Sequence, residues 1–453
     1  MSIIESVNPA NGEVVGSVEI TPSEHVPEIV ARARRAQRDW GTTTLEARVE
    51  ILRRAGELLT ERAADIGRTA TLEMGKPLRE AVGEAQFVAS SFSKELDRMA
   101  AALAPELIES ERVTSTIFQD PFGVVACISP WNFPVLMPHQ QLLPALVAGN
   151  AVVFKPSEEA PLTGQAYADA LLAVLPEGVL TVIHGADEQG KALVAADVDL
   201  IVFTGSRGAG KHIIQQAGKD LKRVILELGG KDPMIVLDDA DVAGAAAFAA
   251  RNSFRNCGQV CISTERIYVD RSIRDRFLEE LESVAATMTV GDGSEEGTRV
   301  GPMVNGVQRS HVARQIDAAV AQGAKVAWRG EAPEGDCFIA PAILTGLTPE
   351  MEIAREETFG PVACVYDVDG EDEAVELAND TPFALGAVVF GEPERARRVA
   401  RRLTAGMIGV NQGLSSAGDT PWVGARQSGY GFHSGRDGHR QFAQTRVVSE
   451  PRG

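Results

Sequence analysis

A cysteine near the middle of the chain lies in a segment whose residue types suit nucleophilic chemistry. Cys261 ends the sequence Gly-Gln-Val-Cys, a few residues after Cys257. A thiol has an unperturbed pKa of about 8.5, and backbone N–H groups at the start of a helix or turn help it to ionise. The segment therefore indicates a thiolate nucleophile at Cys261. Taken alone, however, the same residue is more often a buried structural cysteine.

Two further residues could complete such chemistry. Glu227 precedes Leu-Gly-Gly-Lys, and a carboxylate at the end of a strand can serve as a general base for water. Asn132 lies in Pro-Trp-Asn-Phe-Pro, just after an apolar run, and its amide is a neutral donor suited to an oxyanion. Each residue also has an ordinary interpretation, as a turn-capping glutamate and a turn asparagine.

Small residues at two strand-to-helix turns are typical of a phosphate-bearing ligand. Lys155-Pro-Ser-Glu158 follows one apolar run, and Phe203-Thr-Gly-Ser206 with its following glycines comes after another. Such turns let backbone N–H groups and a helix amino end face a pyrophosphate. The spacing is not Gly-x-Gly-x-x-Gly, so the ordinary dinucleotide fingerprint is absent and this turn alone does not decide that a nucleotide binds.

The elements that must position these residues are a helical block and two α/β series. Residues 26–103 place apolar side chains at three- and four-residue spacing, which is typical of amphipathic helices. From Gly123 onward, short apolar runs alternate with helical segments, as a parallel sheet covered on both faces requires. A second such series follows Asp241. A chain of 453 residues is long enough for two cores, because a single core stops growing at roughly 250–300 residues.

Composition excludes several classes of partner. The chain has 44 lysines and arginines against 63 acids and a net charge of −19, which repels nucleic acid and anionic lipid, so we expect neither as a partner. No apolar run approaches the ~18 residues that span a bilayer, and the start of the chain lacks signal-peptide features, so we expect a cytoplasmic protein. Five cysteines without paired Cys-x-x-Cys clusters predict no disulfide and no metal site.

Seven motifs, in one order along the whole chain, resemble those of the aldehyde dehydrogenase superfamily. The motifs are Pro-Trp-Asn-Phe-Pro at 130–134, Lys-Pro-Ser-Glu at 155–158, Phe-Thr-Gly-Ser at 203–206, Glu-Leu-Gly-Gly-Lys at 227–231, Gly-Gln-Val-Cys at 258–261, Glu-Glu-Thr-Phe-Gly-Pro at 356–361 and Gln-Ser-Gly-Tyr-Gly at 427–431.

The resemblance implies an α/β fold with a Rossmann-like cofactor domain, an α/β catalytic domain and a β oligomerisation arm. The expected bounds are 1–105 and 122–234 for the cofactor domain, 235–430 for the catalytic domain, and 106–121 with 431–453 for the arm. Family members use such arms to pair sheets across a dimer. We therefore expect a homodimer or a homotetramer.

The resemblance also implies a mechanism for oxidising an aldehyde to a carboxylic acid. Cys261 would add to the aldehyde carbon, and the Asn132 side chain with the Cys261 backbone N–H would hold the resulting oxyanion. After hydride transfer a thioester would remain on Cys261, and Glu227 would activate water to hydrolyse it. Relatives that pass the acyl group to coenzyme A generally lack a glutamate at this position, so we expect release of a free acid.

The expected cofactor is NAD, with NADP as the alternative. The resemblance puts Lys155 and Glu158 at the adenosine ribose, and a carboxylate beside the ribose 2′ position accepts a hydroxyl but repels a phosphate. It puts Gly205 and Ser206 near the pyrophosphate and Glu357 and Phe359 at the nicotinamide. The other expected cofactor-binding residues are Ser129, Trp131, Ser157, Gly185, Phe203, Thr204, Leu228 and Gly229.

The substrate is less constrained. Succinic semialdehyde dehydrogenases are similar, but they hold the distal carboxylate with arginines, of which one position is Arg255 here and the other is Gln140. Because a single arginine is a poor two-point clamp for a carboxylate, we expect uncharged or aromatic aldehydes, with succinic semialdehyde as the alternative. The expected pocket residues are Phe133, Met137, Gln140, Arg255 and Trp422.

Three alternatives remain open at this point. Cys257, four residues before Cys261, would form a reversible disulfide with it if both lie on one helical turn; a small buried thiol that fills space is the other interpretation. A protein that kept the fold but lost its activity, as lens proteins of this family did, is a rival of another class. Cofactor-independent ester hydrolysis at Cys261 is a third.

Overall fold

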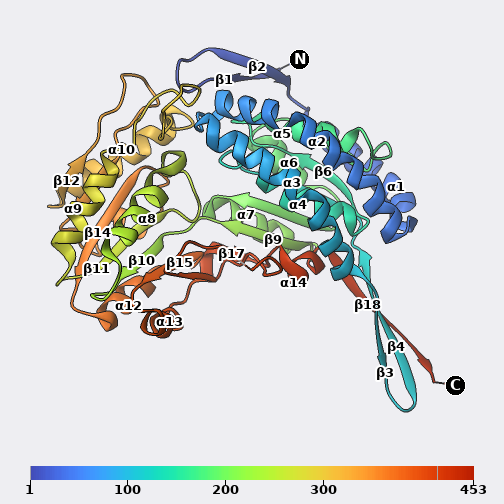
Figure 1. Ribbon diagram of the computed structural model, residues 1–453. Helices are drawn as coiled ribbons and strands as arrows, with labels where there is room; N and C mark the ends of the chain where they lie inside the picture. Colours follow the sequence, from blue (N-terminus) through green and yellow to red (C-terminus); the bar gives the residue numbers. More distant parts are fainter. Residues whose placement is uncertain (1, 416, 453) are drawn as a thin grey trace.

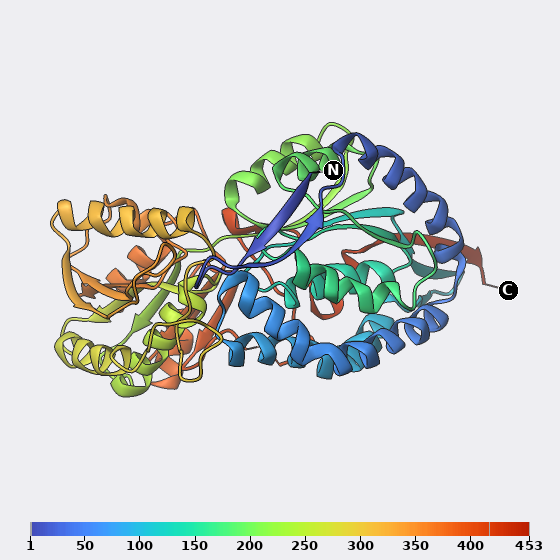
Figure 2. The same cartoon turned by 90° about the horizontal axis from the view of Figure 1, so that it is seen from above.

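The chain folds into two α/β lobes and a projecting arm. The computed structural model describes residues 2–415 and 417–452. Figure 1 shows the first lobe with its blue and green helices, the second lobe in yellow and orange, and the arm that carries the C-terminus away from both. Seen from above, the two lobes lie side by side and are joined near the middle of the molecule (Figure 2). Each lobe has buried apolar clusters of its own, on both faces of its sheet.

The first lobe is built on a six-stranded sheet with strand order β17-β9-β8-β5-β6-β7, parallel except for β17. Its core strands are apolar and wholly buried, as a sheet covered on both faces requires. The strands are β5 (Val124–Ile128), β6 (Ala151–Lys155), β7 (Leu180–Val182), β8 (Leu200–Gly205), β9 (Arg223–Leu228) and β17 (Gly429–Tyr430). A separate hairpin precedes them, made of β1 (Ile3–Val7) and β2 (Val14–Glu19).

Helices cover both faces of this sheet. The longest helix begins after a capping threonine, Thr44, whose side chain accepts a hydrogen bond from the backbone of the first turn, and it ends at Gly75, which adopts a left-handed conformation. The helices are α1 (Val26–Thr42), α2 (Leu45–Met74), α3 (Leu78–Leu103), α4 (Leu136–Val147), α5 (Pro161–Leu172), α6 (Asp187–Ala195) and α7 (Arg207–Ala217). The expected helical block over residues 26–103 is thus made of α1, α2 and α3.

The second lobe surrounds a seven-stranded sheet with strand order β12-β13-β14-β11-β10-β15-β16, parallel except for β12. The strands are β10 (Asp232–Val236), β11 (Thr264–Asp270), β12 (Lys325–Arg329), β13 (Ala342–Thr345), β14 (Val362–Val368), β15 (Gly386–Phe390) and β16 (Met407–Val410). The helices are α8 (Val242–Phe254), α9 (Arg274–Ala285), α10 (Gly306–Ala321), α11 (Glu352–Arg355), α12 (Glu371–Asn379) and α13 (Pro393–Ala400). Only three residues separate β9 from β10, so the chain passes between the sheets by a compact crossover.

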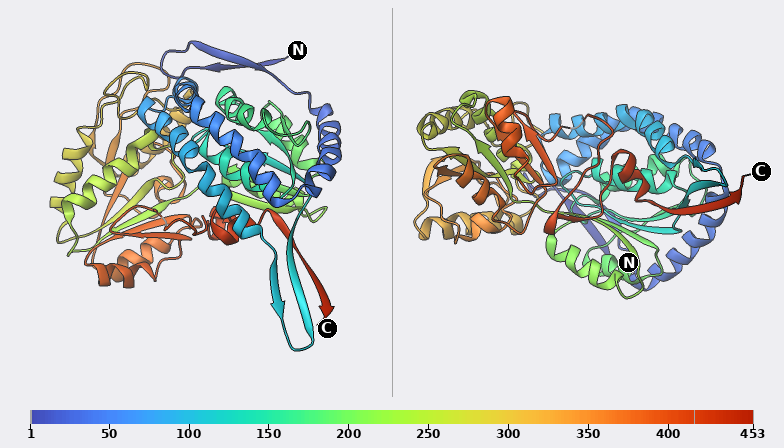
Figure 3. Two further views of the ribbon diagram at one scale, coloured as in Figure 1. Left: turned by 45° about the vertical axis from the view of Figure 1, so that its right-hand side comes forward. Right: turned by 90° about the horizontal axis from the view of Figure 1, so that it is seen from below.

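The arm is a three-stranded antiparallel sheet of order β18-β4-β3. It pairs β3 (Glu106–Glu109) with β4 (Val113–Pro121), and β4 with the C-terminal β18 (Ala443–Pro451), which follows α14 (Gly435–Arg440). The left view of Figure 3 shows this sheet extending beyond the body of the molecule. Residues 106–121 thus form a hairpin whose second strand also pairs with the C-terminal strand.

The described part of the chain contains no helix that is long and apolar enough to cross a membrane.

Candidate active site

Three residues that are remote in sequence line one cavity of about 450 Å³ between the lobes: Asn132, Glu227 and Cys261. Asn132 follows β5, Glu227 lies near the end of β9, and Cys261 precedes β11. The carboxyl ends of parallel strands meet at one edge of a sheet, and the compact crossover brings the second lobe against that edge. The convergence that the sequence predicts is therefore present.

Asn132 is buried and its amide is directed at the turn that carries the cysteine. Its Nδ2 donates to the Gln259 backbone carbonyl at 3.0 Å, and its own backbone carbonyl accepts from Asn256 Nδ2 at 3.3 Å. Gln259 is itself fixed, because its Nε2 donates to the Asn256 carbonyl at 3.0 Å and its Oε1 accepts from the Val304 N–H at 2.9 Å. The side-chain amide therefore has a rigid setting beside Cys261.

The turn before Cys261 has an unusual backbone. Asn256 and Cys257 adopt φ angles of 47° and 55°, in the left-handed region that non-glycine residues rarely occupy, and Gly258 continues with a φ of 71°. A Cβ on Gly258 would overlap the Gly360 backbone carbonyl, so only glycine allows this approach of the two segments. Strain of this kind persists only where the surroundings impose it, and here it sets the position of Cys261.

Cys261 is half-buried beside several carboxylates. Burial, together with the negative charges of Asp232, Glu227 and Glu357, raises the pKa of its thiol to about 12, and Arg255 opposes this shift. In this cavity the thiol is therefore protonated at neutral pH. It becomes a nucleophile only when its proton is removed.

Cys257 does not share a helical turn with Cys261, so the premise of the disulfide hypothesis is wrong. The short helix that contains Cys257 ends at Gly258, and its left-handed residues turn the chain before Cys261. Cys257 is fully buried and packs in the core of the second lobe with residues such as Met234 and Phe254. Burial raises the pKa of the Cys257 thiol above its ordinary range, so this thiol is inert and fills space.

Glu227 is a buried carboxylate with an unsatisfied oxygen. It lies opposite Thr204 of β8 and Gly429 of β17, so it stands between two strands at the sheet edge. Only 4% of the residue is exposed, and its Oε1 has no hydrogen-bond partner. Burial raises the pKa of Glu227 well above its usual range, and the Trp422 side chain offsets a smaller part of that shift. An unpaired buried carboxyl of this kind is typical of a group kept ready for proton transfer.

The expected cofactor residues divide into two sets. Eight line the cavity: Trp131, Thr204, Gly205, Ser206, Leu228, Gly229, Glu357 and Phe359. Six lie outside the lining of that cavity: Ser129, Lys155, Ser157, Glu158, Gly185 and Phe203. Of the second set, Ser129 and Lys155 pair backbones at the ends of β5 and β6, where the Ser129 N–H donates to the Lys155 carbonyl at 3.2 Å, so they lie at the same sheet edge.

The amino end of α7 is open toward this edge. Ser206 caps the helix by accepting a hydrogen bond from the Ala209 N–H, and a Cβ added to Gly208 would meet nothing within 4 Å. The first turn therefore faces open space, which a phosphate could occupy. Nearby on β6, Lys155 is buried and its Nζ pairs with the Glu158 carboxylate at 3.1 Å.

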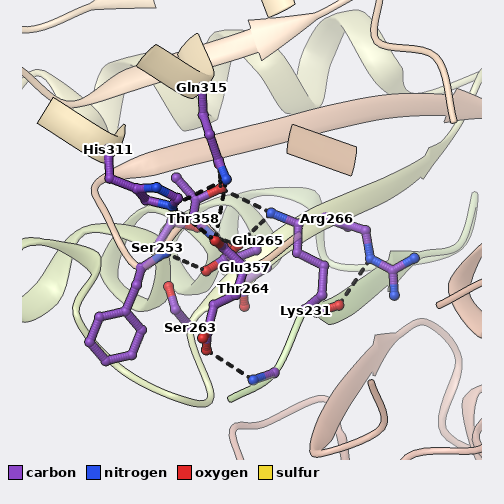
Figure 4. Close-up of polar contacts among 12 residues, drawn as sticks. Lys231, Ser253, Ser263, Thr264, Glu265, Arg266, His311, Gln315, Glu357 and Thr358 are labelled. Carbon is purple, nitrogen blue, oxygen red and sulfur yellow. Dashed lines mark hydrogen bonds and ion pairs between the residues drawn. The ribbon is translucent and has the colours of Figure 1, made fainter. Parts of the chain in front are cut away.

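A buried polar network holds the loop that carries Glu357 and Phe359, as Figure 4 shows. Glu265 forms an ion pair with Lys231 and accepts hydrogen bonds from the backbone N–H groups of Thr358 (2.8 Å) and Phe359 (3.0 Å). Lys231 Nζ also donates to Thr358 Oγ1 at 3.0 Å. The loop is therefore tied to β11 and to the crossover by charged hydrogen bonds.

Glu357 itself lies against the two glycines of the crossover. The Gly230 N–H donates to Glu357 Oε1 at 3.0 Å, and a Cβ on Gly229 would overlap the same carboxylate. Burial raises the pKa of Glu357 to about 8, and the charge of Glu265 adds to the shift. The glycine pair, which the sequence suggested would allow a close approach to the backbone, thus admits this side chain.

All five expected substrate-pocket residues line the cavity: Phe133, Met137, Gln140, Arg255 and Trp422. Two of their polar atoms, Gln140 Oε1 and Arg255 Nε, are buried and have no hydrogen-bond partner. Phe133 is fixed from behind, because its ring contacts the buried Lys76 ammonium, 4.0 Å from the ring centroid. The pocket therefore has apolar walls with two unsatisfied polar atoms.

Two polar lining residues were missed by sequence reasoning. Gln308 and His311 come from α10 and line the cavity close to Glu357. Gln308 Nε2 donates to the Phe359 carbonyl at 3.2 Å, so it supports the same loop. Their three-residue spacing places them on one helix face, but that pattern is common on helices and carries no motif.

Comparison with known proteins agrees with this geometry. A model of the aldehyde dehydrogenase family matches residues 1–448. The chain is 39% identical to a betaine aldehyde dehydrogenase of Sinorhizobium fredii, over 99% of this chain and 93% of the relative. It is 37% identical to an NADP(+) succinate-semialdehyde dehydrogenase of Deinococcus radiodurans, over 98% of this chain and 94% of the relative.

Solved structures show the same fold. A point mutant of betaine aldehyde dehydrogenase from Staphylococcus aureus, solved in complex with NAD+, matches with a TM-score of 0.95 at 32% identity, covering 99% of this chain and 94% of that chain. The α/β fold expected from the resemblance is thereby confirmed. The chain, in which a single cavity gathers Cys261, Glu227 and Asn132, belongs to the aldehyde dehydrogenase family and is an enzyme that oxidises an aldehyde to a carboxylic acid.

Proposed function

We propose that Cys261, Glu227 and Asn132 perform this oxidation through a thioester on Cys261 that water hydrolyses. The observation that supports these roles most strongly is the shared cavity, since a nucleophile, a base and an oxyanion donor must reach one carbonyl group. The rival hypothesis is a binding protein that kept this fold but lost its activity. The presence of all three reactive residues argues against it.

In this proposal Asn132 stabilises the oxyanion. The Cys261 thiol first gives its proton to water in the cavity; when the thiolate sulfur then adds to the aldehyde carbon, the carbonyl oxygen becomes an anion that needs fixed donors. The Asn132 amide is held in place by the Gln259 carbonyl, so little reorganisation is needed as the charge develops. A single donor of this kind is worth about 3 kcal/mol in the transition state.

In this proposal Glu227 activates the water that hydrolyses the thioester. Water must lose a proton as its oxygen attacks the thioester, and a buried carboxylate with one oxygen free of hydrogen bonds is a strong acceptor once it is ionised. The acyl carbon then gains the water oxygen, the bond to sulfur breaks, and a free acid leaves. Detection of acyl-CoA formation faster than acid formation would contradict this step.

For the cofactor we propose NAD. The residues present fit a dinucleotide, because the first turn of α7 faces open space and Gly208 leaves room for a phosphate. When bound, the nicotinamide supplies the hydride acceptor. Lys155 is already paired with Glu158, so its charge is compensated and a 2′-phosphate would find a carboxylate beside it. The ratio of kcat/KM for NAD and NADP tests this, and a ratio that favours NADP would contradict it.

For the substrate we propose uncharged or aromatic aldehydes. Phe133, Met137 and Trp422 give the cavity apolar walls. Arg255 is the one cation that the cavity lining contains, and it repels cationic aldehydes. It also supports the alternative, succinic semialdehyde, whose carboxylate would occupy its unsatisfied Nε. A kcat/KM panel of aliphatic, aromatic, amino and carboxylated aldehydes decides between them, and strong selectivity for succinic semialdehyde would overturn the first choice.

We also propose that the arm forms a homodimer or a homotetramer. Its outer strands β3 and β18 have free edges, and several apolar side chains on it are exposed, among them Leu107 (63%) and Val447 (58%). Light scattering of the full chain measures its molar mass and so tests this proposal. The mass of a monomer at micromolar concentration would contradict it. We further propose that the enzyme is located in the cytoplasm. Its five free cysteines support a reducing compartment of this kind.

A further inference from the structure

A buried ion pair lies behind the segment that carries Asn132. Lys76 precedes α3, and its Nζ lies 2.5 Å from Oε2 of Glu84, a residue of that helix. Only 1% and 5% of the two side chains are exposed, and neither residue lines the cavity that contains Cys261. Burial of two charges is costly unless their other hydrogen-bonding atoms also have partners, so the remaining contacts of this pair are informative.

The second oxygen of Glu84 holds the amino end of α4. Glu84 Oε1 accepts hydrogen bonds from the backbone N–H groups of Val135 (3.0 Å) and Leu136 (2.9 Å). The helix has no side-chain cap of its own and no acidic residue in its first turn. A carboxylate at this end satisfies N–H groups that have no partner within the helix, and the helix dipole favours its charge. The start of α4 is therefore fixed by Glu84.

The same ion pair supports the residue that follows Asn132. Lys76 Nζ lies 4.0 Å from the centroid of the Phe133 ring, a cation–π contact. Phe133 and Leu136 line both the active-site cavity and a second cavity of about 690 Å³, and Lys76 and Glu84 line only the second. The segment after Asn132 is thus a partition with the reacting groups on one side and the ion pair on the other.

The backbone around Lys76 is anchored to the second lobe. Gly75 adopts a left-handed φ of 78°, and the Leu78 N–H donates to the Gly293 carbonyl at 2.8 Å. A Cβ added to Gly301 would overlap the Gly75 carbonyl, so this loop of the second lobe approaches the turn closely. Lys76 is therefore held in place where the two lobes meet.

We propose that Lys76 and Glu84 are positioning residues for the oxidation, an inference that rests on the proposed role of Asn132 as oxyanion donor. The Asn132 amide is held on one side by the Gln259 carbonyl, and the segment that follows it is held on the other side by the ion pair. Without the pair, Phe133 and the start of α4 are free to shift, and the amide moves away from the position where the oxyanion forms. A displacement of about 1 Å can slow a reaction about 10²-fold.

The test compares Glu84→Gln with the matched control Glu73→Gln. Glu73 is a buried glutamate of α2 that holds the amino end of α5, because it accepts hydrogen bonds from the N–H groups of Leu162 (2.9 Å) and Thr163 (2.7 Å). It thus supports a helix in the same way as Glu84. No residue of α5 lines the active-site cavity, so this support has no connection to Asn132.

The readout is acylation of Cys261 by p-nitrophenyl acetate without cofactor, followed as the first turnover of p-nitrophenolate release. Addition of the thiolate to the ester forms an oxyanion that Asn132 would stabilise. A series of ester concentrations separates the limiting acylation rate from the half-saturating concentration. Both glutamate variants are also made in an Asn132→Ala background, and thermal unfolding shows that each variant is folded.

Glu84→Gln should slow acylation about tenfold with little change in the half-saturating concentration, because a misplaced donor stabilises the transition state less. In the Asn132→Ala background the same substitution should slow acylation by less than about twofold, since no amide is left to position. Glu73→Gln should keep the acylation rate of the parent.

A further tenfold loss from Glu84→Gln in the Asn132→Ala background overturns the inference, because Glu84 would then act through another residue. Equal acylation rates in Glu84→Gln and Glu73→Gln assign Glu84 a purely structural role and overturn it as well. If Glu84→Gln does not fold, Lys76→Met keeps the carboxylate that holds α4 and should show the same loss through Asn132, and no loss contradicts the proposal. An Asn132→Ala variant that is acylated at the parent rate would contradict the proposed oxyanion role and the inference with it, whereas the other outcomes overturn the inference alone.

Discussion

Two buried carboxylates, on the strands β9 and β11, have opposite surroundings. Glu227, at the end of β9, has an oxygen without a hydrogen-bond partner and faces the cavity. Glu265, held by Lys231 at the other end of the crossover, has an ion pair and two backbone donors (Figure 4). Both carboxylate oxygens of Glu265 thus have partners and its side chain is rigid. Burial of the unsatisfied Glu227 oxygen, in contrast, lowers the stability of the folded state. The difference separates a group that builds the site from a group that reacts in it.

The largest effect should come from substitution of Cys261, the proposed nucleophile. Cys261→Ala should lower aldehyde oxidation at least about 10⁴-fold, because without the nucleophile no thioester forms. Cofactor binding should persist, since the α7 turn and the Glu357 loop are untouched. NADH fluorescence measures the rate, and quenching of protein fluorescence by NAD measures binding. Residual oxidation within tenfold of the parent would contradict the role of Cys261.

The comparison itself is tested by matched substitutions of the two carboxylates. Glu265→Gln leaves Lys231 buried without its counter-charge and should destabilise the protein by about 3–5 kcal/mol. Glu227→Gln removes an unsatisfied carboxyl and should leave the thermal midpoint unchanged or higher. Thermal unfolding followed by circular dichroism measures both. Equal midpoints for the two variants would show that the surroundings of Glu265 do not matter to stability.

Removal of the oxyanion donor should have the next largest effect. Asn132→Ala should lower kcat by about 10²–10³-fold, because the amide acts on charge that develops only in the transition state. The substrate KM should change little. Steady-state kinetics over a range of aldehyde concentrations separates the two parameters. A rise in KM with unchanged kcat would instead assign Asn132 to substrate binding.

The smallest effect concerns stability against pH near Glu357. Burial raises the pKa of Glu357 from an ordinary 4.5 to about 8, so the folded state holds its proton more tightly than the unfolded state does. The stabilisation from this proton is complete below pH 4.5 and is lost as the pH rises to about 8. Glu357→Gln should therefore flatten the fall of the thermal midpoint between these pH values. An identical pH dependence in parent and variant would contradict the shift.

Sequence motifs indicated the residues that line the cavity more completely than the residues that hold those side chains in place. Cys261, Glu227 and Asn132 each lie in a short motif, and the order of those motifs along the chain carried the family resemblance that implies their common mechanism. Gln308 and His311 could not be found in this way, because their contacts with the loop of Glu357 and Phe359 join residues 51 and 46 positions apart and leave no local pattern. Cys257 was misplaced for the opposite reason: helical spacing to Cys261 is a local pattern, and left-handed residues at 256–258 override it.

The outline of the fold followed from apolar runs and helical periodicity, but the connections between its parts did not. The pairing of β17 with β9 joins residues 429–430 to the first sheet, although they follow the second lobe in sequence. Nothing in that two-residue strand indicates its partner. Long-range pairing is set by tertiary packing, which local patterns do not encode.

The most direct test of the central claim is intact mass spectrometry of Glu227→Gln after rapid mixing with NAD and an aldehyde substrate of the parent. If Cys261 is the nucleophile and Glu227 the base that hydrolyses its thioester, the variant should release about one equivalent of NADH per active site and then stop. Its mass should have increased by the acyl group, and the increase should be absent from a Cys261→Ala double variant. Continued turnover at the parent rate, or an unmodified Cys261 after NADH has formed, would contradict the account.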